Sequence, residues 1–207
     1  DTSLDLLTLI IMKKFLHLGP GDADKSKTTN IFSSDEWEEV RLDINKNANP
    51  DILGSMTDLS MINDEEYHGI FSSHNLEHIY AHQVDSTVKE FVRILKPEGE
   101  LLIMVPDLMI VAKAIVDGKY LEPLYDSPAG PISPVDILYG HRASIAAGNE
   151  YMAHKVGFTM EALLGILKGA GFGTVVGAKG DFNLYALTLK PEKLGKLAEQ
   201  RLKEHLG

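Results

Sequence analysis

The sequence contains no cysteine, which excludes disulfide bridges, thiolate nucleophiles and metal sites built on thiolates. It is also poor in positive charge: 20 lysines and arginines stand against 30 aspartates and glutamates, and the formal net charge is −10. A field of that sign repels phosphate backbones, so we expect no nucleic-acid partner. The apolar stretch 4–12 is far too short to cross a bilayer. It also lacks the basic start and the cleavage site of a signal peptide, and we expect a cytoplasmic protein without membrane contact.

What is present fits one globular domain. The 207 residues are 44% hydrophobic and 24% charged, which is ordinary for such a domain. Met12 stands just before the first predicted strand, so 1–12 is interpreted as an N-terminal extension, with a short helix packed on the domain as the alternative. The domain itself is expected over 13–190, with an insertion at 118–158 and a C-terminal helix over 191–207. A monomer and a homodimer both stay open.

Predicted strands and helices alternate along the chain. Apolar residues at positions 84, 88, 91, 92 and 95 recur at helical spacing, whereas 100–105 is a near-continuous apolar run typical of a central parallel strand. Such patterns predict strands over 14–18, 39–44, 50–53, 67–72, 100–105, 172–178 and 183–189, and helices over 84–95, 108–116, 159–168 and 191–206. Four of the nine prolines lie in 118–139, which we predict to be a long loop. The alternation predicts an α/β fold: a mostly parallel seven-stranded sheet with helices on both faces and a C-terminal antiparallel hairpin.

Two glycines flank a proline at the end of the first predicted strand. The short apolar run 15–18 is followed by Gly19, Pro20 and Gly21. Glycine lets the backbone turn tightly and approach a ligand closely. A turn at this place in an α/β sheet is where nucleotide-like cofactors bind. A glycine turn without a ligand is the alternative.

An acidic residue, Asp43, ends the second predicted strand, 22 residues after Gly21. A carboxylate there can accept hydrogen bonds from the ribose hydroxyls of a nicotinamide dinucleotide or of S-adenosylmethionine. A simple cap of the strand end is the alternative. A dinucleotide needs a third glycine and a helix N-terminus near its pyrophosphate, but Asp22 and Asp24 follow here. Acidic groups oppose a pyrophosphate and suit an ammonium and a sulfonium, so the pattern favours S-adenosylmethionine.

Further motifs follow the glycine turn in a fixed order. They are HLGPG at 17–21, LDI at 42–44, PDILGS at 50–55, SSHNLEH at 72–78, RILKPEG at 93–99, VPD at 105–107 and AGF at 170–172. In this order they resemble the class I S-adenosylmethionine-dependent methyltransferases, specifically the small predicted methyltransferases with a Leu-Glu-His motif. The resemblance covers 13–189 and implies a Rossmann-like fold with S-adenosylmethionine as cofactor. It does not specify the methyl acceptor.

The resemblance also implies the positions that bind the cofactor. The glycine turn would pass under the methionine part, the end of the second strand would hold the ribose and the adenine, and the residues after the third and fourth strands would face the adenine and the methyl end. These positions are, in order, Gly19, Pro20, Gly21, Asp43, Ile44, Ser55, Met56, His74 and Asn75. Ser55 departs from the family pattern, because many relatives carry an aspartate there, and a hydroxyl binds the adenine amine less strongly.

The stretch from His74 to His78 also matches the H-x-x-E-H pattern of a zinc metallopeptidase family. In that family two histidines on one helix face bind zinc and the glutamate activates water, and Glu150 is the conceivable third ligand here. The pattern requires a helix throughout, whereas the predicted strand 67–72 runs directly into it. We therefore expect no metal. Glu77 and His78 either shape the strand-to-helix turn by local hydrogen bonds or lie on the substrate side.

A second group of polar side chains lies in the insertion, at 136–142 and 149–155. We hypothesise that the acceptor pocket is lined by Tyr139, His141, Arg142, Asn149 and His154. The guanidinium of Arg142 could pair an acceptor carboxylate or phosphate, and His141 or His154 could be a general base. A surface loop with scattered polar residues is the alternative.

The sequence therefore predicts a methyltransferase that uses S-adenosylmethionine and acts on an unidentified small molecule. A non-catalytic cofactor-binding or interaction protein on the same fold is the first alternative, because fold does not fix function. A nicotinamide oxidoreductase and a zinc hydrolase are less favoured. Whether oxygen, nitrogen or carbon is methylated stays open.

Overall fold

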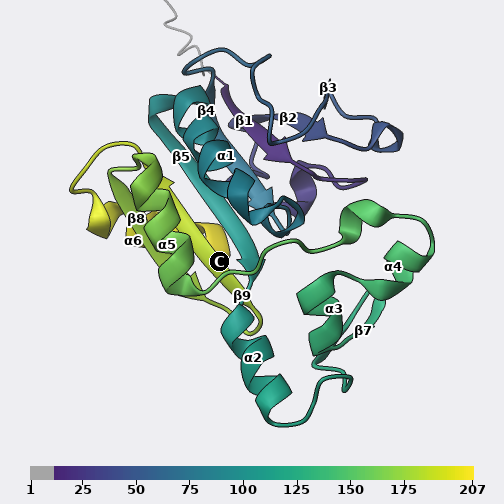
Figure 1. Cartoon of the computed structure of the whole chain (residues 1–207). Coiled ribbons are helices and arrows are strands. Elements are labelled where there is room, and N and C mark those ends of the chain that lie inside the picture. The colour runs from purple at the N-terminus through teal and green to yellow at the C-terminus, as the bar shows by residue number, and fades with distance from the viewer. Residues whose placement is uncertain (1–11) are drawn as a thin grey trace, which may run out of the picture.

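The computed structural model describes residues 12–207, and a seven-stranded sheet runs through its centre (Figure 1). In order across the sheet, the strands are β3 (Ile52–Leu53), β2 (Trp37–Asp43), β1 (Lys13–Leu18), β4 (Tyr67–Ser73), β5 (Leu95–Pro106), β9 (Asn183–Leu189) and β8 (Thr174–Lys179). The first five are parallel to one another, whereas β9 runs antiparallel to both of its neighbours. The predicted sheet and its C-terminal hairpin are confirmed. The N-terminal extension expected before the first strand lies outside the described residues, except for Met12.

Helices cover both faces of this sheet, as predicted (Figure 1). On one face α1 (Ala81–Ile94) and α5 (Met160–Ala170) lie side by side over a cluster of buried aliphatic residues. α1 buries Val84, Val88 and Phe91, whose spacing along the sequence brings them to one side of the helix. The apolar stripe that predicted this helix is therefore the surface that attaches it to the sheet.

An aromatic layer covers the opposite face of the sheet. The ring of Phe15, on β1, stacks on that of Phe32 with centroids 4.7 Å apart, and Trp37 meets Phe32 edge-on at 4.9 Å. The C-terminal helix α6 (Gly195–Leu206) closes this layer with Ala198 and Leu202, which are both buried. The last helix is thus part of the hydrophobic core rather than an appendage.

The insertion 118–158 leaves the sheet after α2 (Leu108–Val116) and returns before α5 (Figure 1). The prediction of a long loop over 118–139 is wrong, because the chain forms the hairpin of β6 (Tyr125–Ser127) and β7 (Gly130–Ile132) and then α3 (Pro134–Tyr139). Pro134 occupies the first turn of α3, where a missing N–H costs no helical hydrogen bond. The short helix α4 (Arg142–Ala146) and a 3₁₀ turn (Glu150–Met152) complete the insertion.

Two element boundaries differ from the prediction by four residues or more, whereas the others differ by three at most. β5 begins at Leu95 instead of residue 100, but Tyr67 pairs with Leu95 and Gly69 with Glu100, so residues 96–99 bulge out of the ladder where the sequence predicted a turn. α6 begins at Gly195, because 191–194 first fold back on Thr174, whose hydroxyl donates to the Pro191 carbonyl at 2.7 Å. Within residues 12–207, no helix combines the length and the apolar character that crossing a membrane requires.

Candidate functional site

The glycine turn at the end of β1 has a backbone that requires glycine. Gly19 and Gly21 have φ angles of +55° and +58°, in the left-handed region that side chains disfavour. A Cβ on Gly19 would lie only 2.0 Å from Oδ1 of Asn75, whereas nothing lies within 4 Å of the corresponding position on Gly21. Gly19 is therefore needed both for its conformation and for the close approach of another side chain.

Asp43 joins this turn to the end of β2. Its carboxylate is 6% exposed, and its two oxygens accept hydrogen bonds from the N–H groups of Gly21 and Asn45, each at 2.8 Å. A carboxylate has about four acceptor positions. Asp43 thus fixes two loops and keeps free acceptor capacity toward the neighbouring cavity.

Asn75 ties the end of β1 to the end of β4. Its Nδ2 donates to the carbonyls of Leu18 at 2.6 Å and Ser73 at 2.8 Å, and the side chain is almost fully buried. His74, just before it, has a left-handed backbone with φ of 53° and a partly exposed side chain. A residue with that φ is uncommon outside glycine and marks a constrained turn.

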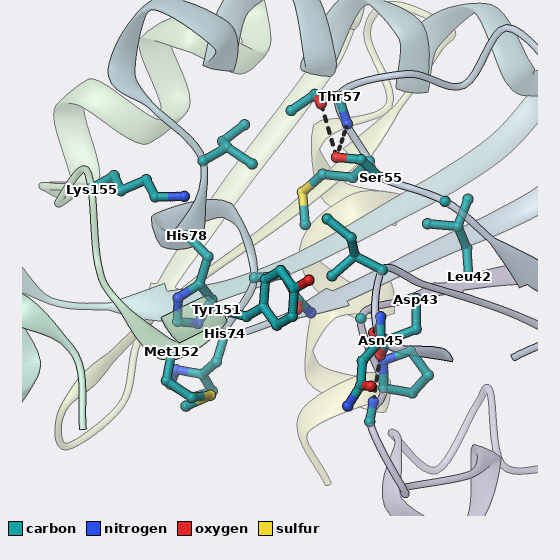
Figure 2. A pocket seen from close by; sticks show the side chains of 18 of the residues that line it. Leu42, Asp43, Asn45, Ser55, Thr57, His74, His78, Tyr151, Met152 and Lys155 are labelled. Carbon is teal, nitrogen blue, oxygen red and sulfur yellow. Dashed lines mark hydrogen bonds between the residues drawn. The ribbon is translucent and has the colours of Figure 1, made fainter. Parts of the chain in front are cut away.

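A cavity of 550 Å³ opens where these three groups meet (Figure 2). Pockets for small molecules and cofactors span roughly 300–1,000 Å³, so this volume can hold one. Figure 2 shows Asp43 and Asn45 on one wall, Ser55 and Thr57 on a second, and His74, His78 and Met152 opposite them. The walls come from the ends of β1, β2 and β4, from the segment after β3, and from the insertion.

The structure brings all nine cofactor candidates to this cavity. The lining includes Gly19, Pro20, Gly21, Asp43, Ile44, Ser55, Met56, His74 and Asn75. Ser55 stands where many members of the family carry an aspartate. Its hydroxyl oxygen is hydrogen-bonded to the Thr57 hydroxyl at 2.8 Å and accepts a hydrogen bond from the Thr57 N–H at 3.2 Å. The contacts of these residues with the cofactor stay predictions.

Of the five acceptor candidates, Asn149 lines the cavity, and the structure places the others elsewhere. Tyr139 is exposed, and Nδ1 of His141 lies 2.8 Å from the Ser144 hydroxyl. Arg142 is engaged by Asp136, with Nε 2.7 Å from its Oδ1. Burial raises the pKa of Asp136, but hydrogen bonds from Arg142 and Ser133 outweigh it and hold that pKa well below its usual range. The guanidinium of Arg142 is therefore already paired.

His154, the fifth candidate, lies beside the Leu-Glu-His turn, the 3₁₀ segment Leu76–His78 that follows β4. Its ring centroid is 4.8 Å from that of His78, and its Nδ1 lies 2.6 Å from the Ile137 carbonyl. Burial lowers the pKa of His154 below its usual value. His154 therefore belongs to a cluster with Glu77 and His78 at the edge of the cavity.

Further residues, which the sequence prediction missed, also line the cavity. They are Tyr151, Met152 and Lys155 from the insertion, with Tyr80 and Gln83 from the start of α1. The Lys155 ammonium lies 4.7 Å from the centroid of the Tyr80 ring, a cation–π contact. The only sequence signal for these residues was the polar stretch 149–155. To predict that Tyr151 and Lys155 line the cavity and that His154 does not, one would need to know the direction in which each side chain points.

Part of the chain matches a known protein family. Residues 19–103 match the family model described as a methyltransferase domain, and no curated protein sequence matches the chain. That segment runs from the glycine turn to β5 and so includes every cofactor candidate.

Solved structures with this fold include several methyltransferases. The 1,6-didemethyltoxoflavin-N1-methyltransferase of Burkholderia thailandensis, solved with 1,6-didemethyltoxoflavin and S-adenosylhomocysteine bound, is 15% identical, with a TM-score of 0.54 over 87% of this chain and 72% of its own. A methyltransferase from Methanosarcina mazei is 16% identical, with a TM-score of 0.56 over 87% and 93% of the two chains. One from Archaeoglobus fulgidus is 14% identical, with a TM-score of 0.55 over 86% of each chain. Residues 19–103 therefore match the methyltransferase domain family, and the described chain has the fold of the class I S-adenosylmethionine-dependent methyltransferases; the comparisons together indicate S-adenosylmethionine as the cofactor.

Proposed function

We propose that the protein is an enzyme that transfers the methyl group of S-adenosylmethionine to a small molecule bound in the same cavity. The observation that carries this proposal is that the cavity has two ends. One is lined by the glycine turn and Asp43, and the other by residues 149–155 of the insertion. A protein that only stored the cofactor would need the first end alone. The small molecule bound in the Burkholderia structure supports the same class of acceptor here.

The first end fits a nucleoside that carries an amino acid. Gly19 brings the backbone close to the cavity, and Asp43 keeps free acceptor positions for two ribose hydroxyls. We assign the adenine to the wall formed by Ile44, Met56 and the paired hydroxyls of Ser55 and Thr57. When bound there, the cofactor supplies a methyl group that its sulfonium makes electrophilic.

The second end would hold and orient the acceptor. In Figure 2 the ring of Tyr151 lies between the wall of Asp43 and Asn45 and the wall of His74 and His78. There it can exclude water and hold the acceptor against the methyl group. Asn149 offers an amide, and Lys155 offers a positive charge to an acidic group of the acceptor. These residues align the reacting atoms, and a base is needed only if the acceptor must lose a proton.

The remaining acceptor candidates have other assignments. For Arg142 we propose a positioning role, because its pair with Asp136 holds the first turn of α3 against the start of α4. Tyr139 and His141 would contact only an acceptor that extends beyond the cavity, since neither lines it.

The test measures cofactor binding and methyl transfer separately. We expect the wild-type chain to bind S-adenosylhomocysteine in calorimetry and to transfer a tritiated methyl group to the small-molecule fraction of a cell extract. Tyr151→Ala should lower transfer by about tenfold or more and leave the affinity for S-adenosylhomocysteine nearly unchanged. Tyr120→Ala, at a partly exposed tyrosine outside the cavity, is the matched control and should behave like the wild type.

Two outcomes contradict the proposal. Cofactor binding without transfer to any fraction of the extract would favour a non-catalytic binding protein. Equal transfer by Tyr151→Ala and the wild type would mean that the insertion does not hold the acceptor.

A further inference from the structure

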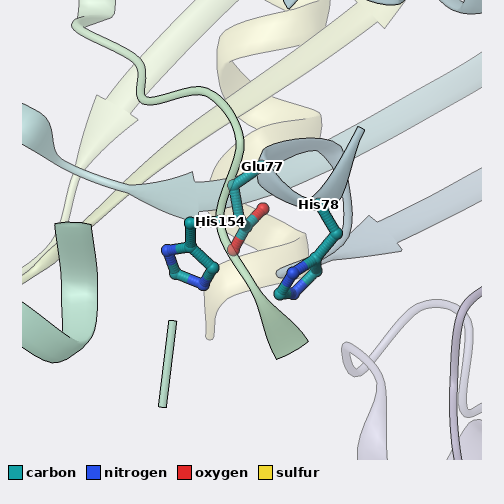
Figure 3. A group of neighbouring side chains, drawn as sticks. All are labelled: Glu77, His78 and His154. Carbon is teal, nitrogen blue, oxygen red and sulfur yellow. The ribbon is translucent and has the colours of Figure 1, made fainter. Parts of the chain in front are cut away.

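Three side chains without a role in the proposed methyl transfer lie together at the edge of the cavity. Glu77 and His78 come from the Leu-Glu-His turn after β4, and His154 comes from the insertion (Figure 3). One potential ligand atom from each lies within 4.8 Å of the other two. The fold thus joins two residues of one short turn with a third that is distant in sequence.

Glu77 is a buried carboxylate without hydrogen bonds. The residue is 1% exposed, and neither of its oxygens has a hydrogen-bond partner among the described residues. Nδ1 of His74 is 3.4 Å from one of these oxygens. An ionised carboxylate away from water costs several kcal/mol unless a positive charge compensates it. A cation bound beside Glu77 would compensate this cost.

Both imidazoles use Nδ1 in a contact with a backbone carbonyl. Nδ1 of His78 lies 3.2 Å from the Ala153 carbonyl, and Nδ1 of His154 lies 2.6 Å from the Ile137 carbonyl. A carbonyl oxygen only accepts hydrogen bonds, so each Nδ1 carries the proton and each Nε2 keeps its lone pair. Backbone carbonyls on the far nitrogen are the usual partners of histidines that bind metals.

We propose that Glu77, His78 and His154 bind a divalent transition-metal ion, with zinc as the reference case. Two imidazoles and one carboxylate form a ligand set that zinc and its neighbours prefer, and three protein ligands leave a coordination position open. Two atoms that each lie about 2.1 Å from one ion can be no more than about 4.2 Å apart, so any pair of ligand atoms that is now farther apart than this must move closer on binding. Rotation of the rings about their side-chain bonds provides this movement.

The open position of the ion would face the acceptor. His78 lines the cavity together with Met152 and Lys155, on the wall opposite Asp43. An ion held there could bind an oxygen of the acceptor and fix its orientation; this role rests on the proposed methyl transfer, whereas the metal site itself does not. The inference departs from the sequence-based expectation of no metal. That expectation rested on the predicted strand that runs into the H-x-x-E-H pattern, and it considered Glu150 and not His154 as the third ligand.

The experiment measures metal and cofactor binding on the same full-length preparations. After dialysis against a chelator, Zn²⁺ is titrated by calorimetry and the bound metal is quantified by mass spectrometry. We expect about one Zn²⁺ per chain. Glu77→Gln and His154→Ala should each weaken binding by more than the roughly 10–100-fold that losing an outer partner costs. His82→Ala, at an exposed histidine outside the cluster, is the matched control and should bind like the wild type.

Substituting Co²⁺ adds a spectroscopic check, because the visible bands of bound Co²⁺ should appear in the wild type and in His82→Ala and be absent from His154→Ala. Wild-type protein that takes up no Zn²⁺, or equal uptake by all variants, overturns the site. The binding of S-adenosylhomocysteine separates the two proposals. Cofactor binding without metal binding rejects the metal site alone, and metal binding without cofactor binding rejects the methyl transfer while keeping the site.

Discussion

Replacing Gly19 with alanine should destabilise the protein more than replacing Gly21, although both glycines have nearly the same φ. The left-handed conformation costs a residue with a Cβ roughly 1–2 kcal/mol at either position. Only at Gly19 does the added carbon meet another atom, Oδ1 of Asn75 at 2.0 Å. The comparison therefore isolates the contact from the strain.

The size of the additional effect follows from what Asn75 must give up. If the side chain moves away, the Leu18 carbonyl loses the donor that now lies 2.6 Å away, and a buried acceptor left unpaired costs about 1–3 kcal/mol. We expect Gly19→Ala to lower the free energy of unfolding by about 2–5 kcal/mol and Gly21→Ala by about 1–2 kcal/mol. Alanine restricts the unfolded chain equally in both variants, so the difference between them is unaffected.

Urea unfolding followed by circular dichroism, without cofactor, gives both free energies. A third variant, Asn75→Ala, completes a double-mutant cycle with Gly19→Ala. Removing the Asn75 side chain relieves the clash, so the double variant should be more stable than the sum of the single effects by about 1–3 kcal/mol. Equal losses at Gly19 and Gly21, or additive effects in the cycle, would refute the reasoning.

Two further predictions concern charged groups. Asp43→Asn places an amide donor against the N–H of Gly21 or Asn45. It should therefore weaken S-adenosylhomocysteine binding by about 10–100-fold in calorimetry. An unchanged affinity, or an equal loss in the exposed control Asp58→Asn, would contradict this prediction. Burial raises the pKa of Glu100, but its ion pair with Arg201 at 2.7 Å and the nearby imidazole of His205 outweigh this and lower the pKa to about 2. Because the folded pKa is depressed, this stabilisation is present above the unfolded value of 4.5 and is lost as the pH falls toward 2. In urea unfolding at several pH values, the deficit of Arg201→Ala relative to the wild type should therefore shrink below pH 4.5; a constant deficit would contradict this.

Local patterns were sufficient to predict most of the sheet, the glycine turn and Asp43, whereas the other cofactor candidates came from the resemblance to the methyltransferase family. The apolar run that ends at Gly19 and the alternation that ends at Asp43 mark strand ends, and parallel strand ends share one edge of a sheet. The candidates taken from those ends therefore met at one cavity without any knowledge of side-chain direction.

The insertion could not be predicted in the same way. Its strands β6 and β7 have three residues each, which is too short for the alternation of apolar and polar residues to be recognised. The prolines and glycines around them favoured the prediction of a loop. One sequence signal for α3 was overlooked, the capping box formed by Ser133 and Asp136. Ser133 precedes the helix and Asp136 lies in its first turn, where its carboxylate accepts a hydrogen bond from the Ser133 N–H at 3.0 Å.

The acceptor candidates show a different limit. The sequence left Arg142 as a possible partner for an acidic group of the acceptor. In the structure its guanidinium pairs with Asp136, which lies in the first turn of α3. His154 and Glu77 carry no sequence pattern that relates them, because their contact depends on how the insertion returns to the sheet. Contacts of this kind are set by tertiary packing and cannot be read from spacing.

The carboxylate that bridges the N–H groups of Gly21 and Asn45 has a consequence for ligand capture. Because that bridge exists before any ligand arrives, the amide of Gly21 should exchange its hydrogen slowly in the ligand-free protein. Association then need not wait for a loop to become ordered. Competitive inhibitors would bind to a cavity edge of fixed shape. Rigid nucleoside analogues should therefore bind with higher affinity than flexible ones.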